Sequence, residues 1–283
     1  MVRIRLRLAA VVAAALLTGG CGALTSGVST APAFPSDLPS LAPTGQPSRA
    51  APAHPPAPSP TALSAAALRA APNIPGPWRL VFDDDFNESQ LDPDKWVTCY
   101  DWNDDGCTNA GHRELEWYLP GQVSLSDGAL VLTARKQPTY GYIAAAIQIP
   151  AQGGMFPSFW LMPAGSRTTP PEIDIMEAIE FTDRAQMTLH WTDPVTGKDT
   201  FSAVQYGPVD YPAGYHVFAV DWEPKSITWY IDGVARYRVT DTARIPKVPM
   251  EMLLDLAVGS PKDPPADVRS AQMKVDWVRA WQH

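Results

Sequence analysis

Apolar and polar residues alternate along much of the C-terminal part of the chain. The regular stretches are 129–134, 186–191, 215–222 and 272–281. An alternation with a period of two is typical of strands that bury one face and expose the other. The segments 226–231 and 234–239 are separated only by Asp232 and Gly233, a dipeptide that favours a type I′ turn. The pattern therefore predicts several strands and one tight hairpin.

Helical periodicity with capping residues is nearly absent, and Gly, Pro and Asp turns separate the strand-like segments. Many short strands of this kind indicate a sandwich or barrel rather than alternating β-α units. The region 78–283 holds about 200 residues, which is within the range of one all-β domain. All ten tryptophans lie in it. We therefore expect an all-β domain with one core over 78–283.

The N-terminus has the pattern of an export signal. Three arginines and no acid precede an apolar run over 8–17, as in the first two regions of a secretory signal. A helix that crosses a bilayer needs roughly 20 residues, so this shorter run disfavours a permanent transmembrane span.

The end of this segment, LTGGC over 17–21, is similar to the bacterial lipoprotein signal, in which a cysteine after a small residue receives lipid. Thr18 departs from the aliphatic residue usual at that position. We expect 1–21 to be a signal peptide and Cys21 to be lipidated, with simple secretion as the alternative. The protein is then exported and either anchored on the outer side of the cell membrane or secreted.

Residues 22–77 are mostly Ala, Pro, Ser and Thr with almost no charge. Such a segment buries too little apolar surface to offset the entropy lost on ordering, so we expect it to be disordered and partly polyproline II. At ~3.1 Å per residue it could extend on the order of 100 Å. The segment is interpreted as a tether, or as an inert spacer.

The formal net charge is −8, and loss of the signal would remove three arginines and leave the domain more acidic still. The sequence has neither a basic patch nor a basic helix, which argues against nucleic acid and anionic membrane surfaces as partners. We expect contact with a membrane only through the lipid anchor, and a monomeric protein.

Two further cysteines, Cys99 and Cys107, bound a short loop. In an exported protein two such cysteines most simply form a disulfide. The loop also copies the first half of a calcium-binding pattern with Asp101, Asn103, Asp105 and Gly106. Its twelfth position is His112 instead of a bidentate glutamate, so a disulfide-closed turn is favoured over a calcium loop.

Candidate chemistry is concentrated at Glu172, Asp174 and Glu177, which only aliphatic residues separate. In a regular strand Glu177 would face away from the other two acids. A β-bulge between Asp174 and Glu177 would turn all three to one face. Mutual repulsion would then keep at least one acid protonated at neutral pH. A protonated acid beside an ionised one is what glycoside hydrolysis requires, with retention of configuration at a carboxyl spacing of ~5–5.5 Å.

Two other interpretations of these acids exist. A helix could begin after Pro170 and Pro171, with the acids in its first turns, where the helix dipole favours them. A metal cluster is disfavoured because no histidine lies at ligand spacing in the sequence. The flanking segments 154–162 and 188–191 are strand-like and rich in aromatic residues, which stack well on sugar rings. This context favours a carbohydrate cleft.

The chain resembles glycoside hydrolase family 16, the laminarinase and lichenase type, over essentially the whole domain. The matching motifs are FDDDFN at 82–87, KW at 95–96, RELEWY at 113–118, GALVLTA at 128–134, FPSFW at 156–160, EIDIME at 172–177, HVFAVDW at 216–222 and VDWVR at 275–279. The resemblance implies a β-jelly roll of two antiparallel sheets with a carbohydrate cleft on its concave face. It also implies a polysaccharide substrate and no cofactor for catalysis.

The resemblance implies Glu172 as nucleophile, Asp174 as its assistant and Glu177 as general acid/base. The motif contains one extra residue, at Ile175 and Met176, and is thereby similar to the bulged, laminarinase-like form. This similarity implies β-1,3-linked glucan as the substrate.

Further site residues follow from the same resemblance. Trp160 matches a tryptophan of the cleft floor and His190 a cleft histidine, with a core indole and a buried histidine as the alternatives. Trp191, Arg113 and Trp117 are candidate sugar contacts or surface residues of the sandwich.

Asp276 matches a position that binds a structural calcium on the convex side in many relatives, with a solvent-facing strand residue as the alternative. One departure from the family lies at 141–146, where GYIAAA replaces Gly-Arg-x-Glu-x-Arg. We expect different sugar contacts at that strand.

Several functions stay open. A binding module without catalysis would keep the aromatic residues but has no reason to keep three acids. Transglycosylation, or hydrolysis of galactan or mixed-linkage glucan, is compatible with the same residues. Linkage, and endo or exo action, are not decided by any residue in the sequence.

Overall fold

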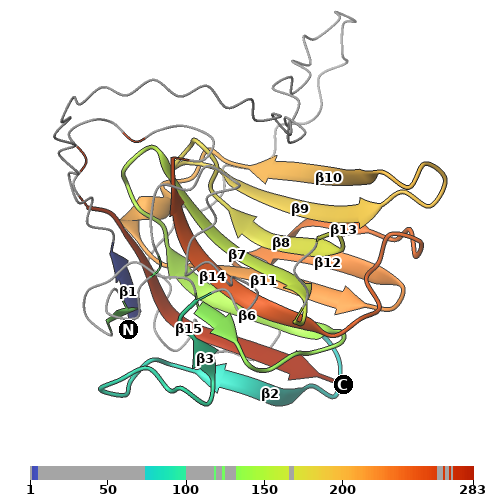
Figure 1. Cartoon of the computed structure of the whole chain (residues 1–283), viewed down its shortest axis with the longest axis horizontal. Coiled ribbons are helices and arrows are strands. Elements are labelled where there is room, and N and C mark those ends of the chain that lie inside the picture. The colour runs from blue at the N-terminus through green and yellow to red at the C-terminus, as the bar shows by residue number, and fades with distance from the viewer. Residues whose placement is uncertain are drawn as a thin grey trace, which may run out of the picture. The chain divides into compact units, whose positions relative to one another are not determined.

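The computed structural model describes residues 2–5, 74–99, 118, 123–124, 132–165, 169–259, 264, 268 and 270–283. These residues form two antiparallel sheets (Figure 1). The one helix among them is the 3-10 helix η4 (Tyr211–Ala213). No helix in the described part of the chain is long and apolar enough to cross a membrane. The predicted all-β sandwich of two antiparallel sheets is confirmed.

The seven-stranded sheet carries the acidic motif in a central strand. Its strand order is β10 (Asp199–Tyr206), β9 (Ala185–Thr192), β8 (Glu172–Glu177), β7 (Met155–Pro163), β14 (Met250–Val258), β5 (Leu132–Ala134) and β3 (Trp96–Val97).

The second layer is an eight-stranded sheet. Its strand order is β13 (Val234–Val239), β12 (Ser226–Ile231), β11 (His216–Glu223), β6 (Gly141–Gln148), β15 (Gln272–Gln282), β1 (Val2–Arg5) and β4 (Val123–Ser124), and β2 (Arg79–Asp84) also pairs with β15. Of the predicted signal, tether and lipidated cysteine at 1–77, only the strand β1 and residues 74–77 fall within the described residues. These assignments therefore stay predictions.

The core lies between the two sheets. Phe159 and Leu161 of β7 and Trp222 and Trp229 of the opposite sheet are completely buried in it. Burying one large apolar side chain contributes roughly 1.5–3 kcal/mol. Because each strand alternates, the inward residues build this core and the outward residues of the seven-stranded sheet remain available for a site.

The predicted hairpin is present between β12 and β13. Asp232 and Gly233 have positive φ angles of 51° and 76°, as a type I′ turn requires. The Asp232 carboxylate accepts a hydrogen bond from the Val217 backbone N–H at 2.9 Å and lies 2.7 Å from His216 Nδ1. The turn is thereby tied to the neighbouring strand β11. The predicted strands at 186–191, 215–222 and 272–281 are also present, and 129–134 is described only over 132–134.

The unusual segment 141–146 is part of β6, in the middle of the eight-stranded sheet. The outward side chains of Tyr142, Ala144 and Ala146 pack with Trp277 and Trp281 in a small apolar cluster. The acidic motif lies in the other sheet, so this departure is not beside the acids, and the expected difference in sugar contacts at this strand stays a prediction. Small alanines make room for the large aromatic side chains on that outer face.

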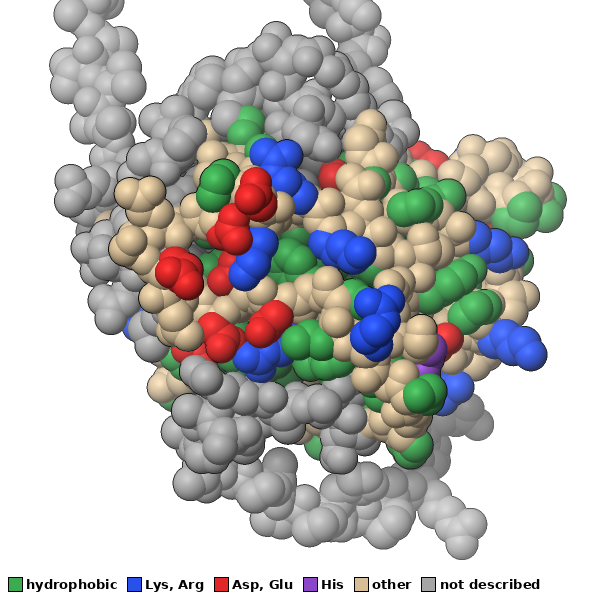
Figure 2. Space-filling view, turned by 90° about the horizontal axis from the view of Figure 1, so that it is seen from below, with side chains coloured by type: hydrophobic (Ala, Val, Ile, Leu, Met, Phe, Trp, Pro, Cys, Tyr) green, Lys and Arg blue, Asp and Glu red, His purple; other side chains and the backbone are tan. Residues whose placement is uncertain are grey.

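Figure 2 shows the side of the molecule on which β2 lies at the bottom of Figure 1. Lys and Arg side chains on this face lie among Asp, Glu and hydrophobic side chains. Positive charge therefore does not gather over the elements seen in this view.

Candidate active site

The acidic motif is a strand. Residues 172–177 form β8 between β7 and β9, so the helical alternative is wrong. Ile173, Ile175 and Met176 are completely buried in the core between the sheets. The backbone N–H and C=O groups of β8 pair with those of β7 and β9. A helix at this position would leave the facing backbone groups of β7 and β9 without these partners.

The predicted β-bulge is present in β8. Asp174 pairs with Thr188 of β9, whereas Glu177, three residues later, pairs with Gln186, only two residues away. The same extra residue appears against β7, where Trp160 pairs with Asp174 and Ser158 with Glu177. Since partners two apart on β9 share a face, Glu172, Asp174 and Glu177 all point to one side of the sheet. We call this side the acid face.

A tryptophan of the opposite sheet holds the bulge. Trp229 Nε1 donates a hydrogen bond of 2.8 Å to the backbone carbonyl of Asp174. Trp229 is completely buried and stacks on Tyr237 with ring centroids 4.7 Å apart. A bulge disrupts the regular ladder and leaves backbone groups that need other partners. The indole supplies such a partner, and no pattern in the sequence indicated this role.

Each acid of the motif has its own polar neighbours. A side-chain hydrogen bond joins Glu172 and Asp174. His190 Nε2 lies 3.1 Å from Asp174 Oδ2 and 3.9 Å from Glu172 Oε1. At the other end of the motif, Glu177 Oε2 accepts hydrogen bonds from Thr188 Oγ1 at 3.0 Å and Gln186 Nε2 at 3.4 Å. β9 therefore supplies the polar contacts along the whole motif.

Burial and mutual repulsion raise the pKa values of these acids. Burial raises the pKa of Glu172 from 4.5 to about 8, and the charge of Asp174 adds to the rise. Burial also raises the pKa of Glu177 from 4.5 to about 7, with a further rise from Glu172, while the bond from Thr188 opposes it. The pKa of Asp174 lies well above 3.8 through burial and the charge of Glu177. The acids titrate as one cluster that keeps protons at neutral pH.

The cluster also has the composition of a possible cation site. Single ligand atoms of Glu172, Asp174 and His190 lie within 4.8 Å of one another. The spacing argument from the sequence missed this histidine because His190 comes from a neighbouring strand. Metal ligands must be deprotonated, so a cation here would displace the proton between Glu172 and Asp174.

Trp160 lies on the acid face beside Asp174 and is half-buried. Its Nε1 donates a hydrogen bond of 2.7 Å to Asp255 Oδ1 on β14. One side of the indole packs against a small cluster that contains Tyr118, Met162 and Leu253. The ring is thus held in one orientation while part of its surface stays open. The structure brings Trp160 and His190 together with the three acids, as the resemblance implied.

Trp191 does not lie on the acid face. It follows His190 on β9 and therefore points to the opposite face, where it packs against the core between the sheets. The Arg244 guanidinium covers its ring at 4.5 Å from the centroid. The interpretation of Trp191 as a sugar contact beside the acids is therefore wrong.

The remaining predicted residues lie elsewhere. Arg113, Trp117 and Cys107 fall outside the described residues, so their roles and the disulfide with Cys99 stay predictions. Asp276 is partly exposed at a register shift of β15 in the eight-stranded sheet. Among the described residues, the cluster with three potential metal ligands does not include Asp276. A calcium ion there would need backbone carbonyls or water as its other ligands.

The sequence reasoning missed several residues of the acid face. Gln186 and Thr188 are spaced from His190 by multiples of two on the same strand, so alternation alone would have placed all three on one face. Phe201 on β10 and Asp255 on β14 come from distant segments, and only the strand pairing brings them to the acids.

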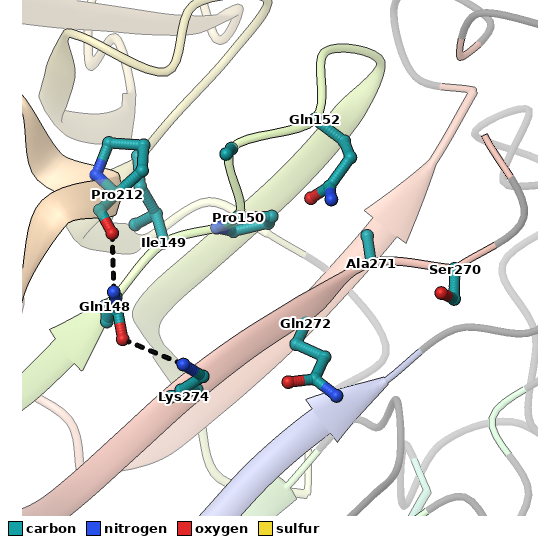
Figure 3. Close-up of a pocket in the computed structure, with 10 residues that line it drawn as sticks. Gln148, Ile149, Pro150, Gln152, Pro212, Ser270, Ala271, Gln272 and Lys274 are labelled. Carbon is teal, nitrogen blue, oxygen red and sulfur yellow. Dashed lines mark hydrogen bonds between the residues drawn. The ribbon is translucent and has the colours of Figure 1, made fainter. Parts of the chain in front are cut away.

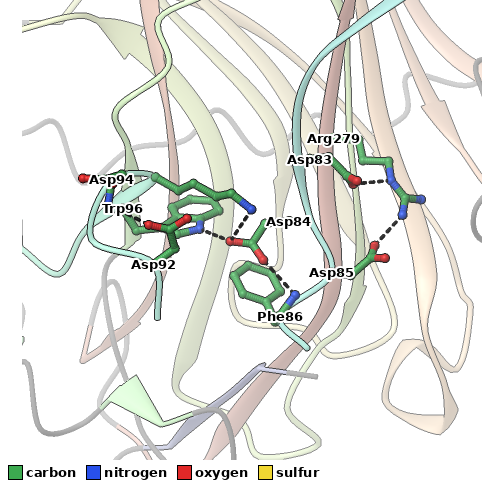
Figure 4. A network of polar contacts seen from close by, with 9 residues as sticks. Asp83, Asp84, Asp85, Phe86, Asp92, Asp94, Trp96 and Arg279 are labelled. Carbon is green, nitrogen blue, oxygen red and sulfur yellow. Dashed lines mark hydrogen bonds and ion pairs between the residues drawn. The ribbon is translucent and has the colours of Figure 1, made fainter. Parts of the chain in front are cut away.

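A second group of acids lies at the end of β2 (Figure 4). The Asp84 carboxylate is buried and accepts hydrogen bonds from Trp96 Nε1 at 2.7 Å and the Phe86 backbone N–H at 2.8 Å. The guanidinium of Arg279 binds both Asp83 and Asp85. These acids connect β2 with β15 and β3, and each has an N–H partner.

A polar hollow of about 460 Å³ opens between the end of β6, the start of β15 and η4 (Figure 3). Lys274 Nζ donates to Gln148 Oε1 at 3.2 Å, and Gln148 in turn donates to the Pro212 carbonyl. No strand of the seven-stranded sheet contributes to its described lining. The hollow is therefore separate from the acid face.

Known proteins are similar to this chain in sequence and in fold. The family model of the glycosyl hydrolases family 16 matches residues 99–279. The endo-1,3-1,4-beta-glycanase EglC of Rhizobium meliloti (strain 1021) is 32% identical over 242 residues, which cover 71% of this chain and 51% of that protein. The beta-glucanase of Rhodothermus marinus is 28% identical over 254 residues, which cover 72% of this chain and 85% of that protein.

Among solved structures, the laminarinase catalytic domain of Thermotoga maritima MSB8 superposes with a TM-score of 0.63 at 22% identity, over 73% of this chain and 98% of that chain. This likeness shows the jelly-roll fold. The chain spans about half the length of EglC. From the extent of the family match and the identity to EglC, the chain belongs to the glycosyl hydrolases family 16.

Proposed function

We propose that the protein is an endo-acting, retaining β-glycoside hydrolase that cuts β-1,3-linked glucan. The observation that carries the proposal is the bulge of β8, which places three carboxyls with raised pKa values on one face of the sheet. Family membership and the names of the relatives, a β-glucanase and an endo-1,3-1,4-β-glycanase, support a β-glucan substrate. The laminarinase-like bulged motif supports the β-1,3 linkage.

In the proposed reaction Glu177 donates its proton to the glycosidic oxygen while the Glu172 carboxylate attacks the anomeric carbon. The C–O bond to the leaving sugar breaks, and a glycosyl-enzyme ester with Glu172 forms. Glu177 then takes a proton from water, which attacks the anomeric carbon and releases Glu172. Burial raises the pKa of Glu177 to about 7 and that of Glu172 to about 8. Near neutral pH Glu177 can therefore hold the proton that it donates, whereas Glu172 has to release its own proton before it attacks.

Asp174 and His190 are proposed to position the nucleophile. Asp174 shares a hydrogen bond with Glu172, and His190 lies within 4 Å of both carboxylates. His190 lowers the pKa of Glu172 and so favours the carboxylate that attacks the sugar. Trp160 is proposed to stack on the sugar next to the cleaved bond, because its ring is fixed by Asp255 and partly open.

Several features outside the acid face are kept as proposals. We propose that Cys21 carries the lipid anchor, that 22–77 is a tether, that Cys99 and Cys107 form a disulfide, and that Asp276 contributes to a structural calcium site. The mature protein is then a monomer held on the outer side of the cell membrane.

The substrate is tested by incubating the purified protein with laminarin, lichenan, galactan and xyloglucan and measuring the lengths of the products. The proposal expects internal cleavage of laminarin to a ladder of short oligosaccharides. Release of single sugars from one end would contradict endo action. Products longer than a short oligosaccharide substrate would indicate glycosyl transfer.

The two glutamates are distinguished by azide. With Glu177→Ala and an aryl glycoside that has a good leaving group, the glycosyl-enzyme still forms, and azide should release a β-glycosyl azide. With Glu172→Ala, azide replaces the nucleophile and should give the α-azide. The surface variant Glu88→Ala is the control and should behave as the wild type. Azides of the opposite configurations, or near wild-type hydrolysis by both variants, would refute the assignment.

A further inference from the structure

The acid face continues from β8 across two more strands. The pairing sets Glu172 opposite His190 of β9, and His190 opposite Phe201 of β10. At the other end Glu177 is opposite Gln186, and Gln186 is opposite Gln205. Because residues in register share a face of the sheet, β10 adds its own side chains to the surface that carries the acids.

The side chains that β10 adds are open to solvent. Phe201, Ala203 and Gln205 are exposed, whereas the alternate residues Val204 and Tyr206 pack against the core. Phe201 is 53% exposed, although a phenylalanine could have been buried on the other face of the same strand. β10 is the edge strand of the sheet, so this surface is the outer end of the acid face.

The exposed ring of Phe201 has a neighbouring ring on β9. The Phe201 ring lies beside His190 with centroids 5.5 Å apart and planes inclined at 34°. His190 in turn lies 3.9 Å from the Glu172 carboxylate. Only the His190 side chain therefore separates the Phe201 ring from the proposed nucleophile Glu172. The strand pairing sets this arrangement.

The remaining polar groups of this region are amides. Gln205 Nε2 donates to Gln186 Oε1 at 3.2 Å, and Gln186 Nε2 donates to Thr188 Oγ1 at 3.2 Å and to Glu177 at 3.4 Å. The small side chain of Ala203 lies between Phe201 and Gln205. An aromatic face, a gap and hydrogen-bonding amides together are what recognition of a sugar ring requires.

We propose that Phe201 is the aromatic platform of an outer glucan subsite, on which a pyranose ring stacks with its apolar C–H face. The inference rests on the proposed function, because it concerns the same acid face. Strands are about 4.8 Å apart, so β10 lies about 10 Å from β8. The sugar on Phe201 is therefore not the one attached to Glu172 but another ring farther along the same glucan chain.

This placement predicts an effect that depends on substrate length. A long glucan that covers both β8 and β10 uses the platform, whereas the shortest oligosaccharide that is cleaved reaches only the acids. Loss of one aromatic stacking contact corresponds to about a fivefold to tenfold change in affinity. Phe201→Ala should therefore lower kcat/KM about tenfold on polymer and at most about twofold on the shortest substrate.

The experiment compares wild type, Phe201→Ala, Phe201→Trp and Val234→Ala on laminarin and on laminari-oligosaccharides of increasing length. Val234 is an exposed apolar residue on β13 of the other sheet, so its variant should match the wild type at every length. Phe201→Trp keeps an aromatic face and should preserve the length dependence. Melting temperatures verify that all variants are folded.

Binding without turnover separates this inference from the proposed function. Migration in gels that contain soluble laminarin should be retarded for the wild type and clearly less retarded for Phe201→Ala. If the wild type binds laminarin in this way but does not cut it, the proposed function fails and the platform stands. If the wild type cuts laminarin and Phe201→Ala equals it at every length, or loses activity equally at every length, the platform is refuted.

Discussion

Two groups of three acidic residues in the described part of the chain differ in their surroundings. In β2 and the residue after it, Asp83 and Asp85 bind the Arg279 guanidinium, and Asp84 accepts from two N–H groups with Lys95 Nζ at 3.7 Å. In β8 the acids have one another, a histidine and the neutral donors Thr188 and Gln186. Among the residues that the structure describes, the first group is matched by positive charge, and the second is not.

The difference shows which acids serve structure and which are available for chemistry. A carboxylate whose partners are cations and N–H groups connects strands through charged hydrogen bonds. Carboxyls that share a buried face with few cations keep protons, which costs stability but leaves a proton to transfer. Sequence composition does not separate the two groups, because both are runs of acids next to apolar residues.

The largest expected effect is on activity, from one matched substitution in each group. Glu172→Gln should lower kcat on laminarin on the order of 10⁴-fold, because it removes the proposed nucleophile. Asp84→Asn should change kcat less than about twofold but lower the free energy of unfolding by about 2 kcal/mol, because a charged hydrogen bond of the buried carboxylate is lost. Steady-state kinetics and urea unfolding measure both. If Asp84→Asn lost activity without losing stability, the contrast between the groups would be wrong.

Trp229, which holds the β8 bulge, should affect both the free energy of unfolding and the orientation of the acids. Trp229→Phe keeps a buried ring but removes the donor to the Asp174 carbonyl, so we expect a loss of about 1–3 kcal/mol of unfolding free energy. Since the bulge sets the direction of Glu177, kcat should fall as well. Tyr237→Phe keeps the ring stacked on Trp229 and removes only the hydrogen bond to Ser202, so it is the control for a lost hydrogen bond that does not involve the bulge. Equal kcat in all three proteins would mean that the bulge does not depend on Trp229.

The raised pKa values predict a pH dependence of stability. Folding raises the pKa of Glu172 from 4.5 to about 8, so the folded protein binds more protons between these values. The stability associated with this group is thus complete below pH 4.5 and is lost as the pH rises through about 8. Glu172→Gln removes this loss and should melt about 5 °C above the wild type at pH 9, with little difference at pH 5. Melting curves across this range are the test, and a constant difference would contradict it.

The smallest expected effect concerns the hydrogen bond to Glu177. The bond from Thr188 lowers the pKa of Glu177, so Thr188→Val should raise that pKa and move the alkaline limb of kcat/KM upward by about half a pH unit. Thr192→Val, at an exposed position farther along β9, is the matched control. A pH profile of Thr188→Val that coincides with the wild type would show that this bond does not tune the acid.

Local pattern was sufficient for much of the fold. Alternation located β9, β11 and β15, and Asp232 with Gly233 located the hairpin between β12 and β13, because these features depend on neighbouring residues in the chain. The spacing of Glu172, Asp174 and Glu177 was sufficient to predict the bulge, because only an extra residue turns all three acids to one face. The same alternation also separates Trp191 from His190, because neighbouring residues of a strand point to opposite faces.

The sequence by itself determined the strand pattern, the acidic motif and the bulge, because each is a matter of side-chain period within one short segment. Only the tertiary structure decided which distant residues meet that motif. Trp229 reaches the Asp174 carbonyl from the other sheet, Asp255 fixes Trp160 from β14, and Phe201 extends the acid face from β10. These contacts depend on strand order and register, which are set by the packing of the whole core and leave no local signal in the chain.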